Sequence, residues 1–454
     1  MNWNQNHANI ISAICSRFNK EEIRYFILRN YEGLPDSNPS KDVDIIIEPK
    51  SLHKAKDILK EEYIKLNIEY YFEEKFTFVH CCHGMNLTNK FSIKIDLIGS
   101  YVSKGFELFT FDELYFYSEN YKEFRVLNKF FEGVMVFIYK QFNYTPKLKK
   151  EYKQIIYNTY IKYPDFKTLI DKLIGENLSS QIFTEIDKQN FDKMLSHSSK
   201  LTIALRKYAF RKNPIKTTKL VIYFISERLT RMIFRYNKFS KVISVMGPDG
   251  AGKTTFLDSL KYLINFYFSS DEDDPRYTIY HFRPNLLPNL GVIGEKSGVR
   301  KQDIDFTNPH RAKPVNKFSS LIRITYYWLD YVLGYMFFVR LDSKYSRFSI
   351  FDRYSYDFLV DPTRTRLNLP MWLRKIYVKC MPQPKVGFYL DANPEVVYKR
   401  KQELTIDEIT RQNKIYSDLA SSNKRFYTLD SNRPPIESIN DAIKILIENF
   451  TDKL

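Results

Sequence analysis

The stretch Lys241-Val-Ile-Ser-Val-Met246, followed by Gly247-Pro-Asp-Gly-Ala-Gly-Lys253-Thr254, decides the fold of the second half of this chain. Its apolar start predicts a short buried strand, and the apolar spacing of residues 255–266 predicts a helix. The glycine-rich segment between them matches GxxxxGK[ST], in which glycines let backbone N–H groups surround phosphate oxygens. Because strand, loop and helix occur in the required order, the sequence predicts a nucleotide-phosphate site here.

The residue types in this loop have distinct expected roles. Lys253 would reach the β- and γ-phosphates of ATP, and the hydroxyl of Thr254 would ligate Mg²⁺. The first turn of the following helix would add a favourable dipole for the phosphates. The expected nucleotide-binding residues are Gly247, Asp249, Gly250, Gly252, Lys253, Thr254 and Thr255.

Length and composition exclude several classes of protein. The chain has 454 residues, of which 44% are hydrophobic and 16% aromatic, so it is not intrinsically disordered. That length predicts several domains. Residues 241–454 alternate short apolar runs (241–246, 278–282, 348–351, 386–390, 426–429) with helical segments. This alternation predicts an α/β domain with a doubly wound parallel sheet.

A second polar site is expected where Phe348-Ser-Ile-Phe351 runs into Asp352-Arg353-Tyr354. The carboxyl ends of parallel strands form the ligand-binding edge of such a sheet. Asp352 would hold Mg²⁺ or orient the acceptor, and Arg353 would bind an acceptor phosphate. Asp357, Asp361, Arg364 and Arg366 then form either an acceptor-binding cluster or a polar surface loop.

Residues 241–454 resemble the thymidylate kinase branch of the nucleoside monophosphate kinases. The resemblance depends on the GPDGAGKTT loop, on Asp352-Arg353-Tyr354, and on a strand over 385–390 that is followed by Asp391, Pro394-Glu395 and Lys399-Arg400-Lys401. A last strand over 426–429 ends at Asp430. The resemblance implies an ATP- and Mg²⁺-dependent kinase with this fold.

The same resemblance implies roles for further residues. Arg400 and Arg411 lie where the family has a lid whose arginines stabilise the transferring phosphoryl group. Asp249 corresponds to an acidic position near the acceptor sugar. Arg283, in His281-Phe282-Arg283-Pro284, would bind the acceptor phosphate. This motif differs from the arginine motif of the family, and no thymine-reading set is recognisable. The expected acceptor is therefore a nucleotide or another small phosphorylated molecule.

Three carboxylates stand out in the N-terminal part. Asp42 and Asp44 share one face of a strand, and Asp96 lies in another apolar strand. Carboxylates on adjacent strands would form a second metal site, and burial without partners would be costly. Residues 20–120 resemble the minimal nucleotidyltransferase fold, although Arg29-Asn30 stands where that family has a Gly-Ser pair. An active transferase, a degenerate fold and ordinary strand-edge carboxylates all stay open.

Cysteine usage and hydropathy indicate a cytoplasmic protein. The four cysteines form no CxxC pair, which excludes a disulfide framework and a zinc ribbon. Alternation along a strand would send His80, Cys81, Cys82 and His83 to opposite faces, so we expect no metal there. The most apolar stretch, 321–341, carries Arg323, Asp330 and Arg340, which favours a buried helix over a membrane span.

The net charge of +17 is concentrated in one segment. Residues 193–241 hold thirteen basic side chains and one acidic one, which gives +12. Within 217–241, Arg228, Arg231, Arg235 and Lys238 form a helix stripe beside an apolar face. This helix either packs on a flanking domain or lies peripherally on an anionic membrane. Nucleic acid is not an expected partner, because no RNA- or DNA-binding motif accompanies the charge.

These observations predict three regions: a small α+β nucleotidyltransferase-like domain (1–120), a helical region (121–240) and a thymidylate kinase-like P-loop domain (241–454). The favoured function is ATP-dependent phosphotransfer to a nucleotide or another small phosphorylated acceptor, and nucleotidyl transfer stays open as a second activity. The whole arrangement resembles bacterial proteins that fuse a nucleotidyltransferase-like region to a thymidylate kinase-like one, and this resemblance implies a context in surface-polysaccharide metabolism. One alternative is a metal-dependent nucleotidyltransferase whose P-loop domain senses NTP. Another is a nucleotide-responsive scaffold at the membrane.

Overall fold

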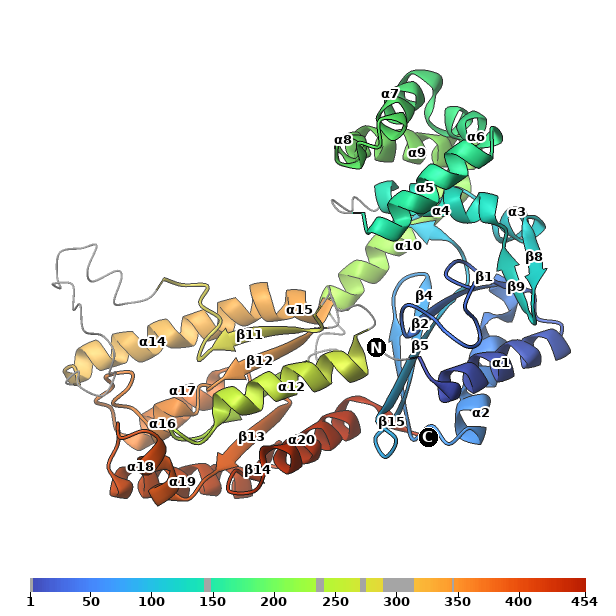
Figure 1. Cartoon of the computed structure of the whole chain (residues 1–454). Coiled ribbons are helices and arrows are strands. Elements are labelled where there is room, and N and C mark those ends of the chain that lie inside the picture. Colours follow the sequence, from blue (N-terminus) through green and yellow to red (C-terminus); the bar gives the residue numbers. More distant parts are fainter. Residues whose placement is uncertain (1–2, 143–147, 234–240, 270–274, 289–313, 345–346) are drawn as a thin grey trace. The chain divides into compact units, whose positions relative to one another are not determined.

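A computed structural model describes residues 3–142, 148–233, 241–269, 275–288, 314–344 and 347–454. The chain forms two compact units, Met1–Thr230 with Leu454 and Arg231–Lys453. Figure 1 labels their helices and strands. The predicted boundary near residue 120 has no counterpart, because the helical region belongs to the first unit. Each unit has its own sheet.

The first unit is built on a mixed sheet in which the strands run in the order β3-β4-β5-β2-β1-β9-β8. Strand β2 pairs in parallel with β5, and β1 pairs in parallel with β9. The strands are β1 (Tyr25–Ile27), β2 (Asp42–Ile47), β3 (Tyr70–Lys75), β4 (Val79–Asn86), β5 (Phe91–Ile98), β8 (Ser118–Tyr121) and β9 (Phe124–Leu127), with a separate hairpin of β6 (Val102–Ser103) and β7 (Phe106–Glu107). The predicted strands that carry Asp42, Asp44 and Asp96 are confirmed as β2 and β5, whereas β3, β8 and β9 were not predicted.

Helices cover both faces of this sheet. Helices α1 (Gln5–Lys20) and α2 (Leu52–Lys65) pack their apolar residues on one face, against Ile45, Ile47 and Ile95. Phe26, Ile46 and Ile98 pack instead against the helical region. That shared core is the physical reason why the helical region is not a separate domain. Its helices are α3 (Phe111–Phe116), α4 (Lys129–Phe142), α5 (Lys150–Lys162), α6 (Asp165–Ile174), α7 (Glu176–Asp187), α8 (Phe191–Ser196) and α9 (Ser198–Lys212).

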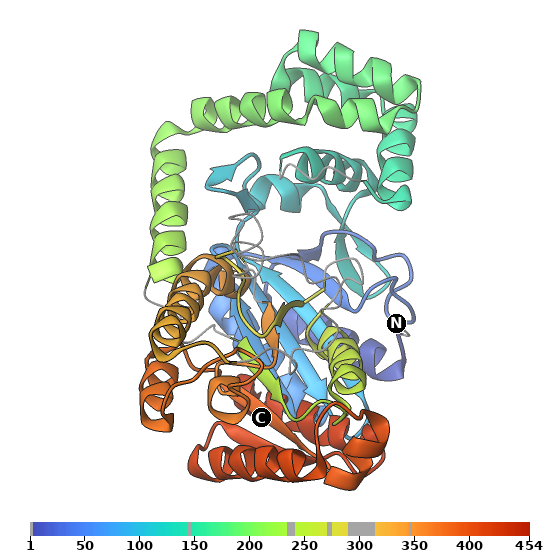
Figure 2. The ribbon, with the colours of Figure 1, turned by 90° about the vertical axis from the view of Figure 1, so that its left-hand side faces the viewer.

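The basic segment continues into α10 (Pro214–Ile233), and Figure 2 shows the sharp turn between α9 and α10. A proline is favourable in the first turn of a helix and keeps the preceding residue out of the helical conformation, so the turn falls at Asn213-Pro214. Helix α10 contacts the first unit through Tyr223, whose ring lies 6.0 Å from that of Phe78. Its apolar residues Ile222, Ile225 and Leu229 are exposed. Residues 234–240, with Arg235 and Lys238, lie outside the described residues.

The second unit contains a parallel five-stranded sheet in the order β11-β12-β10-β13-β14. The predicted α/β fold with a parallel sheet is therefore confirmed for this part of the chain. The strands are β10 (Lys241–Met246), β11 (Tyr277–His281), β12 (Phe348–Asp352), β13 (Val386–Asp391) and β14 (Phe426–Asp430), and a short strand β15 (Asp452–Lys453) follows near the C-terminus. The parallel strands lie within one residue of their predicted positions, because each is a short apolar run between clear helical patterns.

Two sets of helices enclose the parallel sheet (Figure 1). On one face, Phe348 packs against Phe268 and Phe450, which belong to α12 (Lys253–Phe268) and α20 (Pro435–Phe450). On the other face, Val242 and Phe351 share a core with α14 (Lys317–Gly334). The remaining elements are the π-helical turn Tyr335–Val339, α15 (Arg340–Lys344), α16 (Asp357–Val360), α17 (Met371–Cys380), α18 (Pro394–Arg400) and α19 (Ile406–Ser422).

This topology places a ligand crevice at the carboxyl edge of the sheet. Adjacent strands β10 and β12 lead to helices on opposite faces, since α12 follows β10 and α16 follows β12. Loops that diverge in this way leave an opening between them, which is where open α/β sheets bind ligands. Among the described residues, no helix is long and apolar enough to cross a membrane.

Candidate active site

The loop between β10 and α12 has the backbone conformation that its glycines permit. Gly250 has φ +95° and Gly252 has φ +90°, values that residues with a Cβ rarely adopt. A Cβ on Gly250 would also lie 3.0 Å from the carbonyl oxygen of Val397. The loop ends at Lys253, where α12 begins and where the first-turn N–H groups have no acceptor within the helix. The glycine-rich loop and the start of α12 therefore lie at the carboxyl edge of the sheet, in the order that the motif requires.

Lys253 is buried and points back into its own loop. Its Nζ donates to the carbonyl oxygens of Gly247 and Pro248 at 2.9 and 2.8 Å, and lies 3.6 Å from Asp249 Oδ1. Burial, reinforced by the nearby charge of Arg353, lowers the pKa of Lys253 to about 7. An anion bound beside this ammonium group would favour its charged form.

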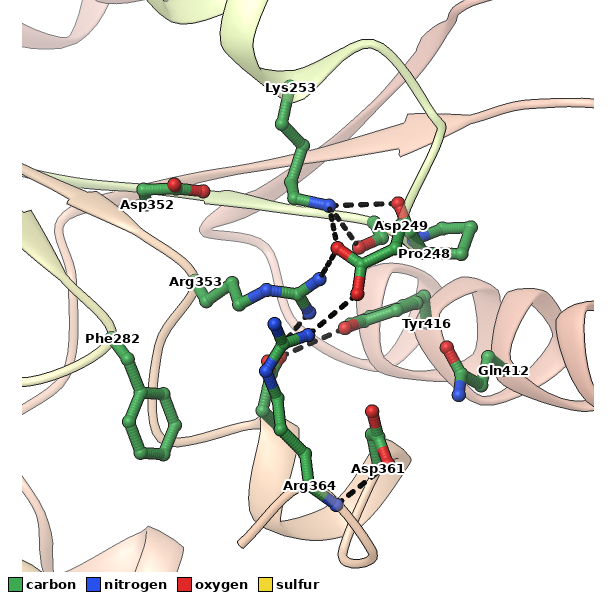
Figure 3. Close-up of polar contacts among 12 residues, drawn as sticks. Pro248, Asp249, Lys253, Phe282, Asp352, Arg353, Asp361, Arg364, Gln412 and Tyr416 are labelled. Atoms are coloured by element: carbon green, nitrogen blue, oxygen red, sulfur yellow. Dashed lines mark hydrogen bonds and ion pairs between the residues drawn. The ribbon is translucent and has the colours of Figure 1, made fainter. Parts of the chain in front are cut away.

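Asp249 is the centre of a cluster of three cations (Figure 3). Arg353 donates to its Oδ1, and Arg364 donates to its Oδ2 at 2.8 Å. Burial would raise the pKa of Asp249, but Arg353, Lys253 and Arg364 hold it well below its ordinary value. Asp249 is therefore ionised throughout the physiological pH range. It keeps three positive charges together next to the phosphate-binding loop.

Arg353 is fixed in place by both its backbone and its side chain. Its φ is +73°, an unfavourable value for a residue with a Cβ, and its N–H donates to the carbonyl oxygen of Val245. Its Nη1 donates to the buried carboxylate of Asp357 at 2.9 Å, and Tyr416 donates to the other oxygen of that carboxylate. A guanidinium held in this way is preorganised to bind an anion at the end of β12.

Further polar and aromatic side chains lie near Arg353 and Arg364 (Figure 3). The backbone N–H of Arg364 donates to Asp361 Oδ1 at 3.2 Å, which orders the loop after α16. The ring of Phe282 lies 5.3 Å from that of Phe358. Gln412, on α19, is buried. Arg364 and Asp361 belong to the polar cluster noted in the sequence. Gln412 and Tyr416 were not predicted, because no local motif marks them on α19.

The residues at the carboxyl end of β12 fit a magnesium ion. Asp352 Oδ1 is buried without a hydrogen-bond partner among the described residues, which is costly unless water or a cation satisfies it. The other oxygen, Oδ2, lies 3.4 Å from Nδ1 of His281. Thr254 is exposed in the first turn of α12. Asp352 and Thr254 are the oxygen donors that Mg²⁺ prefers beside phosphate.

Three further predicted residues lie outside this cluster. Arg283 is buried and binds Asp330 at 2.7 Å and the carbonyl oxygen of Leu287, so its guanidinium orders its own loop. Arg411 binds Glu408 and the carbonyl oxygen of Val360. Arg400 is exposed at the end of α18. Within the described part of the chain, none of these three arginines contacts Asp249, Lys253 or Arg353. Their roles in acceptor binding and transfer stay predictions.

The three N-terminal carboxylates lie on one face of the first sheet, with a lysine among them. Strand pairing places Asp44 opposite Asp96, and Asp42 opposite Lys94. Lys94 Nζ lies 2.8 Å from Asp96 Oδ2, and Arg29 Nη2 lies 2.9 Å from Asp44 Oδ2. These carboxylates therefore have cationic partners. In the described ranges no group of three or more His, Cys, Asp or Glu side chains is placed to hold a metal ion, and the second metal site stays a prediction.

Comparisons with known proteins add little to this geometry. No protein-family model and no curated protein sequence matches the chain. Among solved structures, a thymidylate kinase from Ehrlichia chaffeensis is similar over 45% of this chain and 97% of its own, with 14% identity and a TM-score of 0.29. A likeness of this size establishes neither family nor activity.

Proposed function

We propose that the second unit is an ATP-dependent phosphotransferase that acts on a nucleotide or another small phosphorylated acceptor. The observation that supports this most directly is the cluster of Lys253, Arg353 and Arg364 around Asp249, next to a glycine-rich phosphate loop. Transfer of a phosphoryl group between two anionic molecules requires cations that are already in place. If the P-loop only sensed NTP, no acceptor phosphate would be bound, and two arginines beside Asp249 would have no role in the reaction.

In this proposal each group has a defined task. Lys253 leaves the carbonyl oxygens of Gly247 and Pro248 and binds the β- and γ-phosphates. Arg353 and Arg364 bind the acceptor phosphate, which replaces part of their contact with Asp249. Asp249 then accepts hydrogen bonds from a polar part of the acceptor. Asp352 and Thr254 would hold Mg²⁺, which neutralises charge on the phosphates when it is bound. Arg400 and Arg411 would close over the transferring group.

The test is an acceptor screen with labelled ATP, covering nucleoside monophosphates, sugars and sugar phosphates. The sugar compounds are included because the implied context is polysaccharide metabolism. We expect transfer of label to at least one acceptor, with thymidylate as one candidate among several. Asp44→Asn is the matched variant, because loss of the main activity in this variant would instead support the nucleotidyltransferase alternative. Absence of label on every acceptor would contradict the kinase proposal.

We also propose that α10 contacts an anionic membrane surface. The exposed apolar residues Ile222, Ile225 and Leu229 favour it, together with the +12 charge of residues 193–241. Vesicle sedimentation at low salt tests it. The full chain should pellet with anionic vesicles and stay in solution with neutral ones, and Ile222→Ser/Ile225→Ser should weaken pelleting. If the chain does not pellet even with anionic lipid, the membrane proposal fails.

A further inference from the structure

The carboxylate cluster of the first unit contains a buried ammonium group at its centre. Strand β5 places Lys94 two residues before Asp96, and residues two apart in a strand share a face. Its Nζ is 2.8 Å from Asp96 and 4.0 Å from Asp42, so it lies within the carboxylate group rather than beside it. The exposed fraction of its side chain is 7%. An ammonium so deeply buried needs negative partners.

Two carboxylates lie close to this ammonium group. Asp96 Oδ2 is 2.8 Å and Asp42 Oδ2 is 4.0 Å from Lys94 Nζ, and carboxylates at these distances favour the charged form of the amine. The cluster therefore contains a buried ammonium group in contact with Asp96.

The remaining carboxylate also has a cation of its own. Arg29 Nε and Nη2 both lie 2.9 Å from Asp44 Oδ2. Arg29 stands where the nucleotidyltransferase-like pattern would have a small residue that makes room for nucleotide phosphates. A divalent ion that bound Asp44 and Asp96 together would lie close to the Arg29 guanidinium and the Lys94 ammonium, and both positive charges would repel it.

We propose that Lys94 is a built-in cation that takes the place of a catalytic metal, so that the first unit does not perform metal-dependent nucleotidyl transfer. This inference rests on the geometry of the first unit alone and is independent of the proposed kinase activity. It assigns the cluster of Asp42, Asp44, Asp96 and Lys94 to a metal-free arrangement that stabilises the sheet. The nucleotidyltransferase alternative loses its chemical basis if the proposal is right.

Thermal unfolding of the nucleotide-free full chain, with millimolar MnCl₂ or with EDTA, tests this. In wild type, the unfolding temperature of the first unit should be the same in MnCl₂ as in EDTA. Lys94→Ala should unfold at a lower temperature in EDTA and recover about 5 °C in Mn²⁺, because the vacated carboxylates then bind the ion. The double variant Lys94→Ala/Asp96→Asn should show no such recovery.

Two results would overturn the proposal. One is a Mn²⁺-dependent gain in wild type that Asp96→Asn abolishes, since the metal would then coexist with Lys94. The other is a folded Lys94→Ala variant whose unfolding temperature does not rise in Mn²⁺, since the site of the Lys94 ammonium group would then not be one that a metal ion can fill. If Lys94→Ala does not fold, Mn²⁺ titration of wild type and Asp44→Asn by electron paramagnetic resonance decides instead. Equal binding supports the proposal, and loss of a bound ion in Asp44→Asn refutes it.

Discussion

The two units each contain a charged cluster, and the signs of the central and surrounding charges are reversed between them. In the second unit one carboxylate, Asp249, holds three cations that converge on it. In the first unit one ammonium, Lys94, lies among carboxylates. The first cluster is centred on strands β2 and β5, whereas the second is formed by loops and a helix start at the carboxyl edge of its sheet, and both are largely buried. They differ in what an incoming ligand would meet.

The two clusters therefore differ in the charges around the point where a ligand would bind. Lys253, Arg353 and Arg364 surround Asp249, and Asp357 is a further anion that holds Arg353, so a phosphate can enter and take over contacts that Asp249 now makes. In the first unit Lys94 contacts Asp96 Oδ2 and Arg29 contacts Asp44 Oδ2, so a metal ion would meet two cations beside the three carboxylates, although Asp96 Oδ1 has no hydrogen-bond partner among the described residues. Buried carboxylates on adjacent strands therefore indicate a metal site only when no cationic side chain lies on the same face of the sheet.

The largest effect that we expect is the loss of phosphotransfer when Lys253 of the second unit is removed. Lys253→Ala should lower phosphotransfer by about 10³-fold, because the transferring phosphates lose a buried cation at close range. The rate of label transfer from ATP to the acceptor found in the screen measures it. Lys261→Ala, on the exposed part of the same helix α12, is the matched control and should keep full activity. Retained turnover in a folded Lys253→Ala protein would contradict the assignment.

A smaller effect is expected from pH, through the same lysine. Its pKa of about 7 in the nucleotide-free protein lies well below the 10.5 of a free lysine, so Lys253 is partly neutral above pH 7. Bound phosphates favour the charged form, so binding of ATP should take up a proton above pH 7 and none well below it. Apparent affinity for ATP should fall about tenfold per pH unit above pH 7.

Isothermal titration calorimetry in buffers of different ionisation enthalpy measures this proton uptake directly. Lys253→Arg is the informative control, because a guanidinium stays charged and should abolish the uptake while keeping a cation in the loop. An uptake that persists in Lys253→Arg would assign the titrating group elsewhere. The sign also applies to stability, since a depressed lysine pKa makes the nucleotide-free fold more stable as pH rises from 7 toward 10.5.

The comparison also shows what sequence could and could not predict. The glycine loop, Asp249 and Asp352-Arg353 were found because local motifs and strand ends mark them, and the strands of the second unit were placed within one residue. Arg364 was noted only as part of a polar loop. Its contact with Asp249 joins residues 115 positions apart, which spacing along the chain cannot reveal. Arg283 is another example, since its ion pair with Asp330 on α14 joins residues far apart in the sequence and could not be predicted from its motif.

The first unit shows a different limit. Asp42, Asp44 and Asp96 were correctly placed on adjacent strands, but Lys94 was read as part of an apolar strand and not as their partner. Alternation along β5 already puts Lys94 and Asp96 on one face, so the signal was present. What could not be seen was the register of β2 against β5, which brings Lys94 opposite Asp42. Register depends on contacts far apart in sequence.

The smallest effects that we expect come from substituting one arginine in each cluster. Arg364 binds Asp249 at 2.8 Å and Arg29 binds Asp44 at 2.9 Å, with side-chain exposures of 26% and 20%. If the Asp249 cluster serves the reaction and the Asp44 cluster serves stability, the same substitution should give opposite results in the two units.

Arg364→Gln should raise KM for the acceptor about tenfold, because the acceptor phosphate loses a charge-assisted hydrogen bond, with a small change in thermal stability. Arg29→Gln should leave kcat and KM unchanged and lower the free energy of unfolding of the first unit by about 1–2 kcal/mol. Steady-state kinetics and denaturant unfolding of both variants measure the two quantities. A shift in acceptor KM from Arg29→Gln, equal to that from Arg364→Gln, would mean that the first cluster also serves the reaction.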